Sequence, residues 1–202
     1  MVTRTVVAGN YIDMNWERLQ PYDEAILNDI TEGDYRRALG TLVRGYQQAM
    51  VGFCHNMLGD DAAAEETAQD IFLDAYRAMP RFRQQASVRT WLFAIARKKC
   101  LQARRNRDRR GRIRQAQQES IAQSAHRDPP TAAGEDPEAT LQLVRQSLGQ
   151  LPDAERELLI LRYDTGLSVA DIAQVRGISM ATVRRRLARA LDALREVVDS
   201  EA

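Results

Sequence analysis

The sequence has little of what enzymes, secreted proteins and membrane proteins depend on. Among its 202 residues are only two cysteines and two histidines, which leaves a disulfide framework or a metal centre almost no side chains to use. No run of about 20 apolar residues could cross a bilayer, and no apolar stretch follows a basic start as in a secretory signal. A glycine-rich phosphate loop, a metal-ligand spacing and a nucleophile motif are also lacking. We therefore expect a cytoplasmic protein that is not an enzyme, with no metal ion, no cofactor and no membrane partner.

The two cysteines, Cys54 and Cys100, lie far apart in the sequence, and neither belongs to a paired metal-binding motif. Both fall on the apolar faces of expected helices, where a free cysteine is usually a small core residue with an inert thiol. His55 and His126 could complete a metal site with them only through an unusual fold. The pattern favours two buried thiols, and a redox role for either cysteine is the weaker alternative.

The net charge of +1 conceals a sorting of charge along the chain. Residues 59–74 contain six acidic side chains and no basic one, whereas residues 91–114 contain ten basic side chains and one acidic one. A further basic run, Arg184-Arg185-Arg186 followed by Arg189, lies near the C-terminus. Because charged patches act locally, the acidic stretch suits a basic partner, and the basic stretches suit a polyanion such as nucleic acid.

Apolar residues recur with a helical period along most of the chain, and no stretch alternates convincingly with the period of two that is typical of a strand. Glycine, proline and capping residues mark the ends of the periodic stretches, as at Gly59-Asp60-Asp61 and Pro80. The pattern therefore predicts an all-α fold. The expected helices span residues 34–58, 62–79, 89–112, 141–151, 152–163, 168–175 and 179 to the C-terminal region.

The expected helices divide into two small domains joined by a flexible linker. Residues 1–30 form an N-terminal extension with at most one short helix, and residues 31–106 form the first domain. Residues 107–137 form the linker, because the stretch 127–137 holds three prolines, a glycine and several small residues that cannot build a core. Residues 138–202 form the second domain.

The second domain has the features of a helix-turn-helix motif. Ser168 caps a short helix, Gly177 accepts the left-handed conformation of the turn, and Ser179 caps a second helix. Arginine binds guanine bidentately in a major groove and neutralises phosphate, so the basic outer face of the second helix is suited to DNA. A solvated basic face on an ordinary hairpin is the alternative, but the capped turn favours DNA binding. The outward residues are Thr182, Arg184, Arg185, Ala188 and Arg189.

Residues 151–196 closely resemble region 4 of sigma-70-type factors of RNA polymerase. Such a region is expected to bind the minus-thirty-five element of a promoter and to touch the polymerase flap. Ala181 stands where glycine is usual and Arg185 where serine is frequent, and the second change alters the surface that meets the promoter. The resemblance is carried by Leu151-Pro152, Leu167-Ser168, Ile172-Ala173, Gly177-Ile178-Ser179, Thr182-Val183 and Arg186-Leu187.

Residues 59–105 resemble region 2 of the same family, which binds polymerase and melts the promoter. The matching positions are Gly59-Asp60-Asp61, Ala64-Glu65-Glu66, Gln69-Asp70-Ile71-Phe72, Arg81-Phe82-Arg83, Arg89-Thr90-Trp91-Leu92 and Ile95-Ala96-Arg97. The departures are Gln84 for glycine, Gln85 for an acid, Val88 for an aromatic residue, Lys98 for asparagine and Gln102 for aspartate. These positions lie in or beside the segment that meets the minus-ten element, so they leave its sequence preference open.

With both matches in this order, the chain resembles a small, two-domain sigma factor of the extracytoplasmic-function type. The resemblance implies a subunit that directs core RNA polymerase to specific promoters and initiates transcription, while the polymerase supplies the catalysis. It also implies control by an anti-sigma protein.

The resemblance implies three sets of binding residues. The set expected to bind the clamp coiled coil of the largest polymerase subunit is Glu66, Gln69, Asp70 and Leu73. The set expected to bind the unpaired minus-ten strand, with a flipped base held in the loop 82–88, is Phe82, Arg83, Gln84, Gln85, Ala86, Ser87, Arg89, Thr90, Arg97, Lys98, Arg104 and Arg105. The set expected at the minus-thirty-five element is Ser179, Thr182, Arg184, Arg185, Ala188 and Arg189. Trp91 heads the apolar stripe of its helix and is expected in the core.

A stand-alone helix-turn-helix regulator, whose first domain is a sensor or a dimerisation module, is the alternative function. Such a protein would bind an operator tightly without polymerase, usually as a dimer on a palindrome. The acidic helix and the loop from Phe82 to Trp91 argue against it. An enzyme is the least favoured class, because nothing in the sequence supplies a catalytic constellation.

Overall fold

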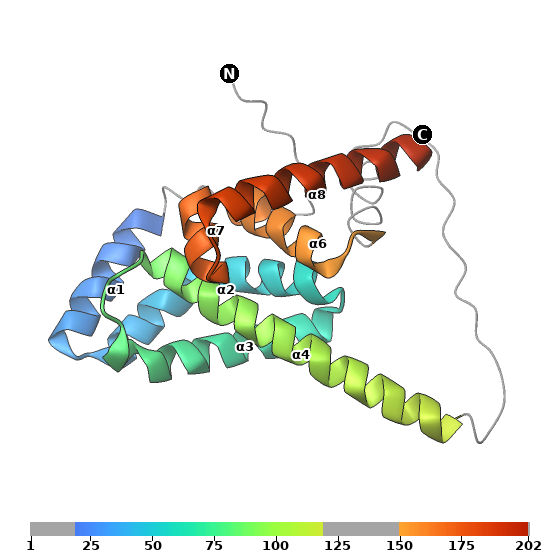
Figure 1. Cartoon of the computed structure of the whole chain (residues 1–202). Coiled ribbons are helices and arrows are strands. Elements are labelled where there is room, and N and C mark those ends of the chain that lie inside the picture. Colours follow the sequence, from blue (N-terminus) through green and yellow to red (C-terminus); the bar gives the residue numbers. More distant parts are fainter. Residues whose placement is uncertain (1–18, 119–149, 202) are drawn as a thin grey trace, which may run out of the picture.

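The computed structural model of the chain describes residues 19–118 and 150–201, and within these ranges it consists of helices and turns without a strand (Figure 1). The all-α prediction is confirmed. The helix expected over residues 141–151 lies almost entirely outside the described residues. The elements are α1 (Gln20–Glu32), α2 (Tyr35–Leu58), α3 (Asp61–Ala78), the 3₁₀ turn η2 (Met79–Arg81), α4 (Val88–Gln118), α6 (Asp153–Leu159), the π-helical turn η3 (Ile160–Asp164), α7 (Val169–Arg176) and α8 (Met180–Glu201).

We call residues 19–118, from α1 to α4, the first unit; α2 and α3 form its antiparallel centre. Asp34 caps α2 by accepting a hydrogen bond from the Arg37 amide, and Gly59 ends the helix in the left-handed conformation at φ 67°. Asp60 then caps α3 by accepting from the Ala63 amide at 2.7 Å. The sequence predicted both helices to within one residue, because these caps are local signals.

Helix α1 belongs to the first unit, although the sequence indicated only an extension with at most a short helix. Its first turn holds Pro21, and its inner face buries Ile26 and Ile30 against α2. Asp29 on the same face is 2% exposed, and its carboxylate pairs with Arg37 of α2 at 2.9 Å. The extension therefore folds back on the helix that follows it.

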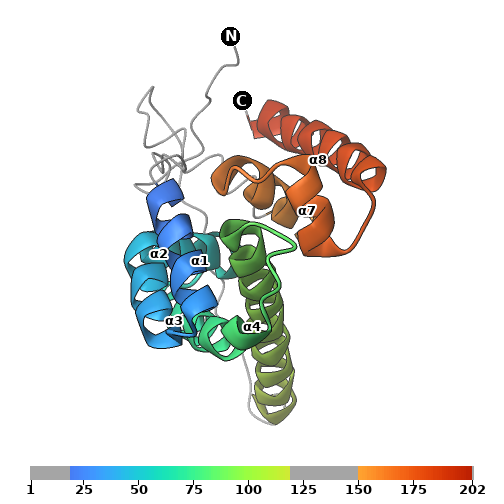
Figure 2. The ribbon, with the colours of Figure 1, turned by 90° about the vertical axis from the view of Figure 1, so that its left-hand side faces the viewer.

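Helix α4 is longer than expected and continues to Gln118, so it takes up the first part of the stretch assigned to the linker. Its N-terminal half buries Leu92, Phe93 and Ala96 against α2 and α3. Its C-terminal half projects beyond the rest of the first unit (Figures 1 and 2). Arginine and glutamine favour helix, which accounts for the extension past the apolar stripe.

We call residues 150–201 the second unit, which is the expected helix-turn-helix. Ser168 and Asp171 form a capping box at the start of α7, and Gly177 turns the chain at φ 63°. Ser179 accepts from the Thr182 amide at 3.2 Å at the start of α8. Both predicted caps are confirmed, because a capping box and a left-handed glycine depend on neighbours in sequence.

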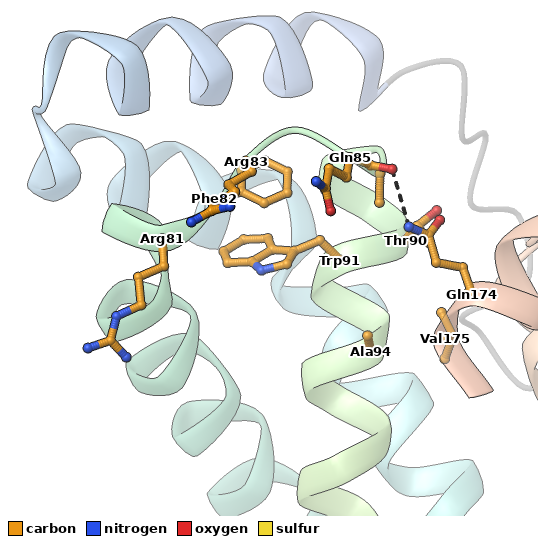
Figure 3. A pocket seen from close by; sticks show the side chains of 10 residues that line it. Arg81, Phe82, Arg83, Gln85, Thr90, Trp91, Ala94, Gln174 and Val175 are labelled. Carbon is orange, nitrogen blue, oxygen red and sulfur yellow. Dashed lines mark hydrogen bonds between the residues drawn. The ribbon is translucent and has the colours of Figure 1, made fainter. Parts of the chain in front are cut away.

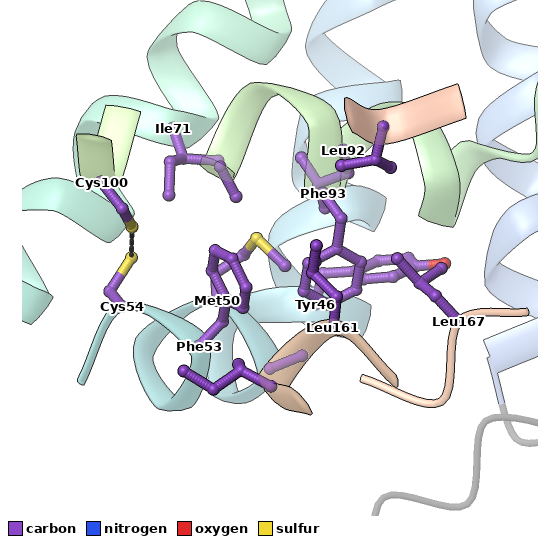
Figure 4. Close-up of a cluster of buried hydrophobic side chains, with 14 of the residues drawn as sticks. Tyr46, Met50, Phe53, Cys54, Ile71, Leu92, Phe93, Cys100, Leu161 and Leu167 are labelled. Carbon is purple, nitrogen blue, oxygen red and sulfur yellow. Dashed lines mark hydrogen bonds between the residues drawn. The ribbon is translucent and has the colours of Figure 1, made fainter. Parts of the chain in front are cut away.

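The two units share one hydrophobic core. Leu161 and Leu167 of the second unit lie against Tyr46 of α2 and Phe93 of α4, and all four are fully buried (Figure 4). Figure 2 shows α7 seated beside the N-terminal half of α4. The second unit therefore packs directly on the first.

Cys54 on α2 and Cys100 on α4 are both fully buried in this core, as the apolar pattern predicts. Their Sγ atoms lie 3.6 Å apart (Figure 4). The hydrogen bond to Cys54, together with burial, raises the pKa of the Cys100 thiol far above its ordinary value. Because the thiolate is the reactive form, this environment disfavours reaction of Cys100.

Among the described residues, none of the helices combines the length and the apolar composition that crossing a membrane would require.

Gly40→Ala and Gly45→Ala form a matched pair that measures how tightly α1 packs on α2. A Cβ at position 40 would meet only Arg44 at 3.6 Å, whereas one at position 45 would lie 3.0 Å from the ring of Tyr22 on α1. Alanine stabilises a helix interior over glycine by about 0.5–1 kcal/mol. We expect Gly40→Ala to raise the free energy of unfolding by this amount. We expect Gly45→Ala to raise it by less, or to lower it, because the new methyl group would crowd the Tyr22 ring. Chemical denaturation measures both changes.

A Tyr22→Ala background is the control for this pair, because it removes the ring that the new methyl group would meet. In that background both glycine substitutions should stabilise the protein equally. Equal stabilisation in the natural background would show that α1 does not rest on α2.

Candidate nucleic-acid interface

A pocket of about 270 Å³ opens where the loop after α3 meets the start of α4 (Figure 3). The rings of Phe82 and Trp91 stack at its wall, with centroids 4.6 Å apart and planes tilted by 30°. The pocket is close in size to the small-molecule sites of proteins, which start at about 300 Å³. Its lining combines aromatic, cationic and amide groups, which is the composition of sites for unpaired bases. The lining residues are Arg81, Phe82, Arg83, Gln85, Ala86, Thr90, Trp91, Ala94, Gln174 and Val175.

Trp91 lines this pocket and is only partly buried, so its expected place in the core is corrected. Phe93, two residues later, takes the core position instead and makes an edge-to-face contact with Phe53, with centroids 5.3 Å apart. The sequence pattern placed Trp91 on the apolar stripe of α4. The buried residues Val88, Leu92 and Ala96 form the inner side of that stripe, and Trp91 is only partly buried beside them.

The loop that forms the pocket is held at both ends by local bonds. The turn η2 ends where the Phe82 amide donates to the Met79 carbonyl at 3.0 Å. At the other end Ser87 caps α4 by accepting from the Thr90 amide at 3.0 Å. Between them Gln84 has φ 54°, and no other described residue except glycine has positive φ. The resemblance had placed glycine at this position, and the backbone conformation shows why.

The expected minus-ten residues of α4 fall into two groups. Lys98 and Arg105 are exposed. Arg97 forms an ion pair with Glu157 of the second unit, and Arg104 pairs with Asp153 at 2.5 Å. The structure therefore places part of this set on an open face and part against the second unit.

The second unit also reaches the loop. Thr90, which is 1% exposed, donates a hydrogen bond to Asp171 at 2.7 Å. Gln174 donates to the backbone carbonyl of Gln85 at 3.2 Å, and Val175 lines the pocket beside it (Figure 3). Sequence reasoning missed Gln174 and Val175, because no local pattern joins residues so far apart in the chain.

Helix α8 presents a basic face to solvent. Val183, Leu187 and Ala190 are buried, whereas Arg184, Arg185 and Arg189 are exposed. The remaining members of the expected minus-thirty-five set, Ser179, Thr182 and Ala188, lie at the cap or on the same side. The amphipathic period thus separated the packing face from the outer face correctly.

Helix α3 presents an acidic face. The four residues expected to bind polymerase are all exposed, and Leu73 is 51% exposed, which is high for a leucine. Tyr76 beside it is 36% exposed; it belongs to the matching segment of region 2 but not to the four residues expected to bind polymerase. Asp70 and Asp74 pair with Lys99 of α4 at 3.5 and 3.0 Å, and the hydrogen bond to Asp74 raises the pKa of Lys99.

In the described part of the chain, no three His, Cys, Asp or Glu side chains cluster as metal ligands.

These surfaces define a helical protein with a helix-turn-helix unit and a pocket lined by aromatic, cationic and amide side chains. Comparison with known proteins assigns its family. Residues 42–110 match the family model for sigma-70 region 2, and residues 141–194 match that for sigma-70 region 4. The chain is 33% identical to the RNA polymerase sigma-H factor of Pseudomonas aeruginosa over 184 residues, covering 87% of this chain and 93% of that protein. It is 37% identical to the ECF RNA polymerase sigma factor SigC of Mycobacterium tuberculosis over 159 residues, covering 78% and 82%.

Two solved structures share the fold. CnrH, in complex with the cytosolic domain of CnrY, has a TM-score of 0.66 at 23% identity and covers 90% of this chain and 99% of its own. RpoE of Bartonella quintana, in complex with the anti-sigma factor NepR, has a TM-score of 0.61 at 23% identity and covers 84% and 99%.

The chain belongs to the sigma-70 family of RNA polymerase sigma factors, in its extracytoplasmic-function group. It directs core polymerase to promoters and initiates transcription, and nothing in the comparisons favours a stand-alone regulator.

Gln84→Gly tests the strain in the pocket loop. A residue with a Cβ loses about 1–2 kcal/mol in the left-handed conformation, and glycine does not. After allowance for the greater freedom of glycine in the unfolded chain, we expect the free energy of unfolding to rise by about 0.5–1 kcal/mol. Gln85→Gly is the matched control in the same loop, and it should lower stability by about 0.5–1 kcal/mol. Denaturation midpoints that shift in the same direction would contradict the assignment of strain to Gln84.

Proposed function

We propose that this sigma factor binds polymerase through the exposed face of α3, holds a flipped minus-ten base in the Phe82–Trp91 pocket, and contacts the minus-thirty-five element through α8. The observation that supports this division most directly is the pocket itself. It joins a stacked aromatic pair to arginine and amide groups at the start of a basic helix.

The pocket suits one unpaired base. Aromatic stacking onto a nucleobase contributes about 1–3 kcal/mol and tolerates any base. The side chain of Gln85, together with backbone groups of the loop, offers the donors and acceptors that could distinguish bases. Arg83, Lys98 and Arg105 are exposed nearby or along α4, where they could neutralise the phosphates of the strand.

The face of α8 suits the major groove of duplex DNA. Three exposed arginines project from a helix whose N-terminus follows the turn, which is the geometry of a recognition helix. We assign Arg184, Arg185 and Arg189 to this contact, together with Ser179, Thr182 and Ala188.

The partners we propose are core polymerase, promoter DNA and an anti-sigma protein. Of the two structural relatives named above, CnrH was solved with the cytosolic domain of CnrY, and RpoE was solved with the anti-sigma factor NepR. On α3, the apolar side chains Leu73 and Tyr76 beside acidic groups form a surface that suits the polymerase clamp. The site of action that follows is the bacterial nucleoid.

Promoter-dependent run-off transcription with sigma-free core polymerase tests the function, on promoters found by mapping transcription start sites after overexpression. The wild-type chain should confer initiation and stay bound to core polymerase in a pull-down. Leu73→Glu should weaken retention by about tenfold or more, because an apolar contact would be replaced by a charge. Gln48→Glu, an equal change of charge at an exposed site on α2, should leave retention unchanged. A chain that supports no start site with any core enzyme would refute the function.

Arg185→Ala tests the α8 face. Loss of a bidentate base contact costs about 1–3 kcal/mol, and loss of a phosphate contact lowers the salt dependence by about one ion. We expect duplex binding by holoenzyme to weaken by about tenfold, measured by anisotropy across salt concentrations. Arg195→Ala is the matched control on the same helix, since Arg195 is exposed and pairs with Asp192 at 3.2 Å. Equal losses from both variants would show only a general effect of charge.

A further inference from the structure

The two thiol groups of the chain meet in the core of the first unit. Cys54 and Cys100 are the only cysteines in the sequence, and both are fully buried. Cys54 lies on α2 and Cys100 on α4, and the Cys100 thiol donates a hydrogen bond to Cys54 Sγ at 3.6 Å (Figure 4). Neither residue belongs to the faces proposed for polymerase or promoter DNA, so the function described above gives this pair no task.

The two sulfur atoms are close enough to form a disulfide bond with each other. Helices α2 and α4 pack directly together, and the S–S bond of a disulfide is about 2.05 Å long, so the sulfurs must approach by about 1.5 Å from their present 3.6 Å. Rotation of the two side chains and a small adjustment of the helices would supply this movement. The bond would join positions 46 residues apart in the sequence.

Burial makes this pair slow to react, but it also holds the two partners side by side. The thiolate is the form that attacks an oxidant, and the hydrogen bond to Cys54 and burial raise the pKa of the Cys100 thiol. An oxidant therefore reaches a reactive sulfur only when the core opens locally. Once one sulfur is oxidised, the second is already in contact with it, so an internal disulfide is favoured over reaction with another molecule.

We propose that Cys54 and Cys100 form a reversible internal disulfide when the protein meets hydrogen peroxide, and that this bond stabilises the first unit by joining α2 to α4. Cys54 is the attacking sulfur, because the hydrogen bond that Cys100 donates stabilises negative charge on it.

The reaction balances in two steps. The Cys54 thiolate attacks one oxygen of the peroxide, the O–O bond breaks, and the departing hydroxide takes up the proton that the thiol released. The Cys100 sulfur then attacks the sulfenic acid on Cys54, the S–O bond breaks, and the oxygen leaves as water with the Cys100 proton. Two thiols lose two electrons in total, and one peroxide becomes two water molecules. A dithiol such as dithiothreitol reverses the reaction by thiol–disulfide exchange.

The crosslink should leave the binding surfaces in place. Leu73 on α3 and Arg185 on α8 are exposed, whereas both sulfurs are fully buried. Trp91 in the pocket lies nine residues before Cys100, which is about 14 Å along the axis of α4. The expected effect is therefore on the stability of the folded chain, because a crosslink restricts the unfolded chain that it closes into a loop.

Oxidation of the full chain tests the proposal. The protein is treated with hydrogen peroxide, catalase removes the excess, and half of the sample is then reduced with dithiothreitol. Before reduction we expect peptide mapping to find the Cys54 and Cys100 peptides linked, and the melting temperature to be higher by at least about 5 °C than after reduction. Run-off transcription at moderate temperature should be equal in the two halves.

Cys54→Ala and Cys100→Ala are the matched controls. Each variant keeps all six methionines of the chain, so it reports methionine oxidation and any other effect of peroxide without the crosslink. Each is compared with its own reduced half, so that a loss of packing from the substitution cancels. Neither variant should show a melting temperature that dithiothreitol changes.

Three results would each overturn the proposal. Free thiols that persist through prolonged peroxide treatment, or links formed only between chains, would show that the pair is not a disulfide site. A linked chain whose melting temperature is the same as or lower than that of the reduced chain would show that the bond does not stabilise the unit. Loss of run-off transcription on oxidation, restored by dithiothreitol, would show that the bond disturbs the binding surfaces.

Discussion

The Glu157 carboxylate is the group on which the arrangement of the two units depends. Its side chain is 3% exposed, and it binds Arg97 of α4 and Arg176 of α7, the latter at 3.6 Å. A carboxylate so far from water is tolerated only when cations or hydrogen-bond donors surround it. One of its two cations comes from each unit, so this single carboxylate links α4 of the first unit to α7 of the second. The surrounding hydrogen bonds and the apolar contacts of Leu161 and Leu167 act in the same direction.

The elements of each unit could be predicted from sequence because their signals are local. Asp60, Ser168 and Gly177 act on backbone groups within four residues, and the helices they bound were found at the expected places. The apolar period likewise separated Val183 and Leu187 from Arg184 and Arg185 on α8. Residues 119–149, which contain most of the expected linker, lie outside the described residues.

The composition of the site could be predicted only in part. The loop and its arginines follow from the sequence, but the covering of the pocket by Gln174 and Val175 does not. Thr90 and Asp171 are 81 residues apart and meet only because two units pack together. A periodic pattern identifies a face that is buried or exposed, but it does not identify which partner covers it. Trp91 was misplaced for a related reason, since an apolar residue on the stripe can line a pocket and not the core.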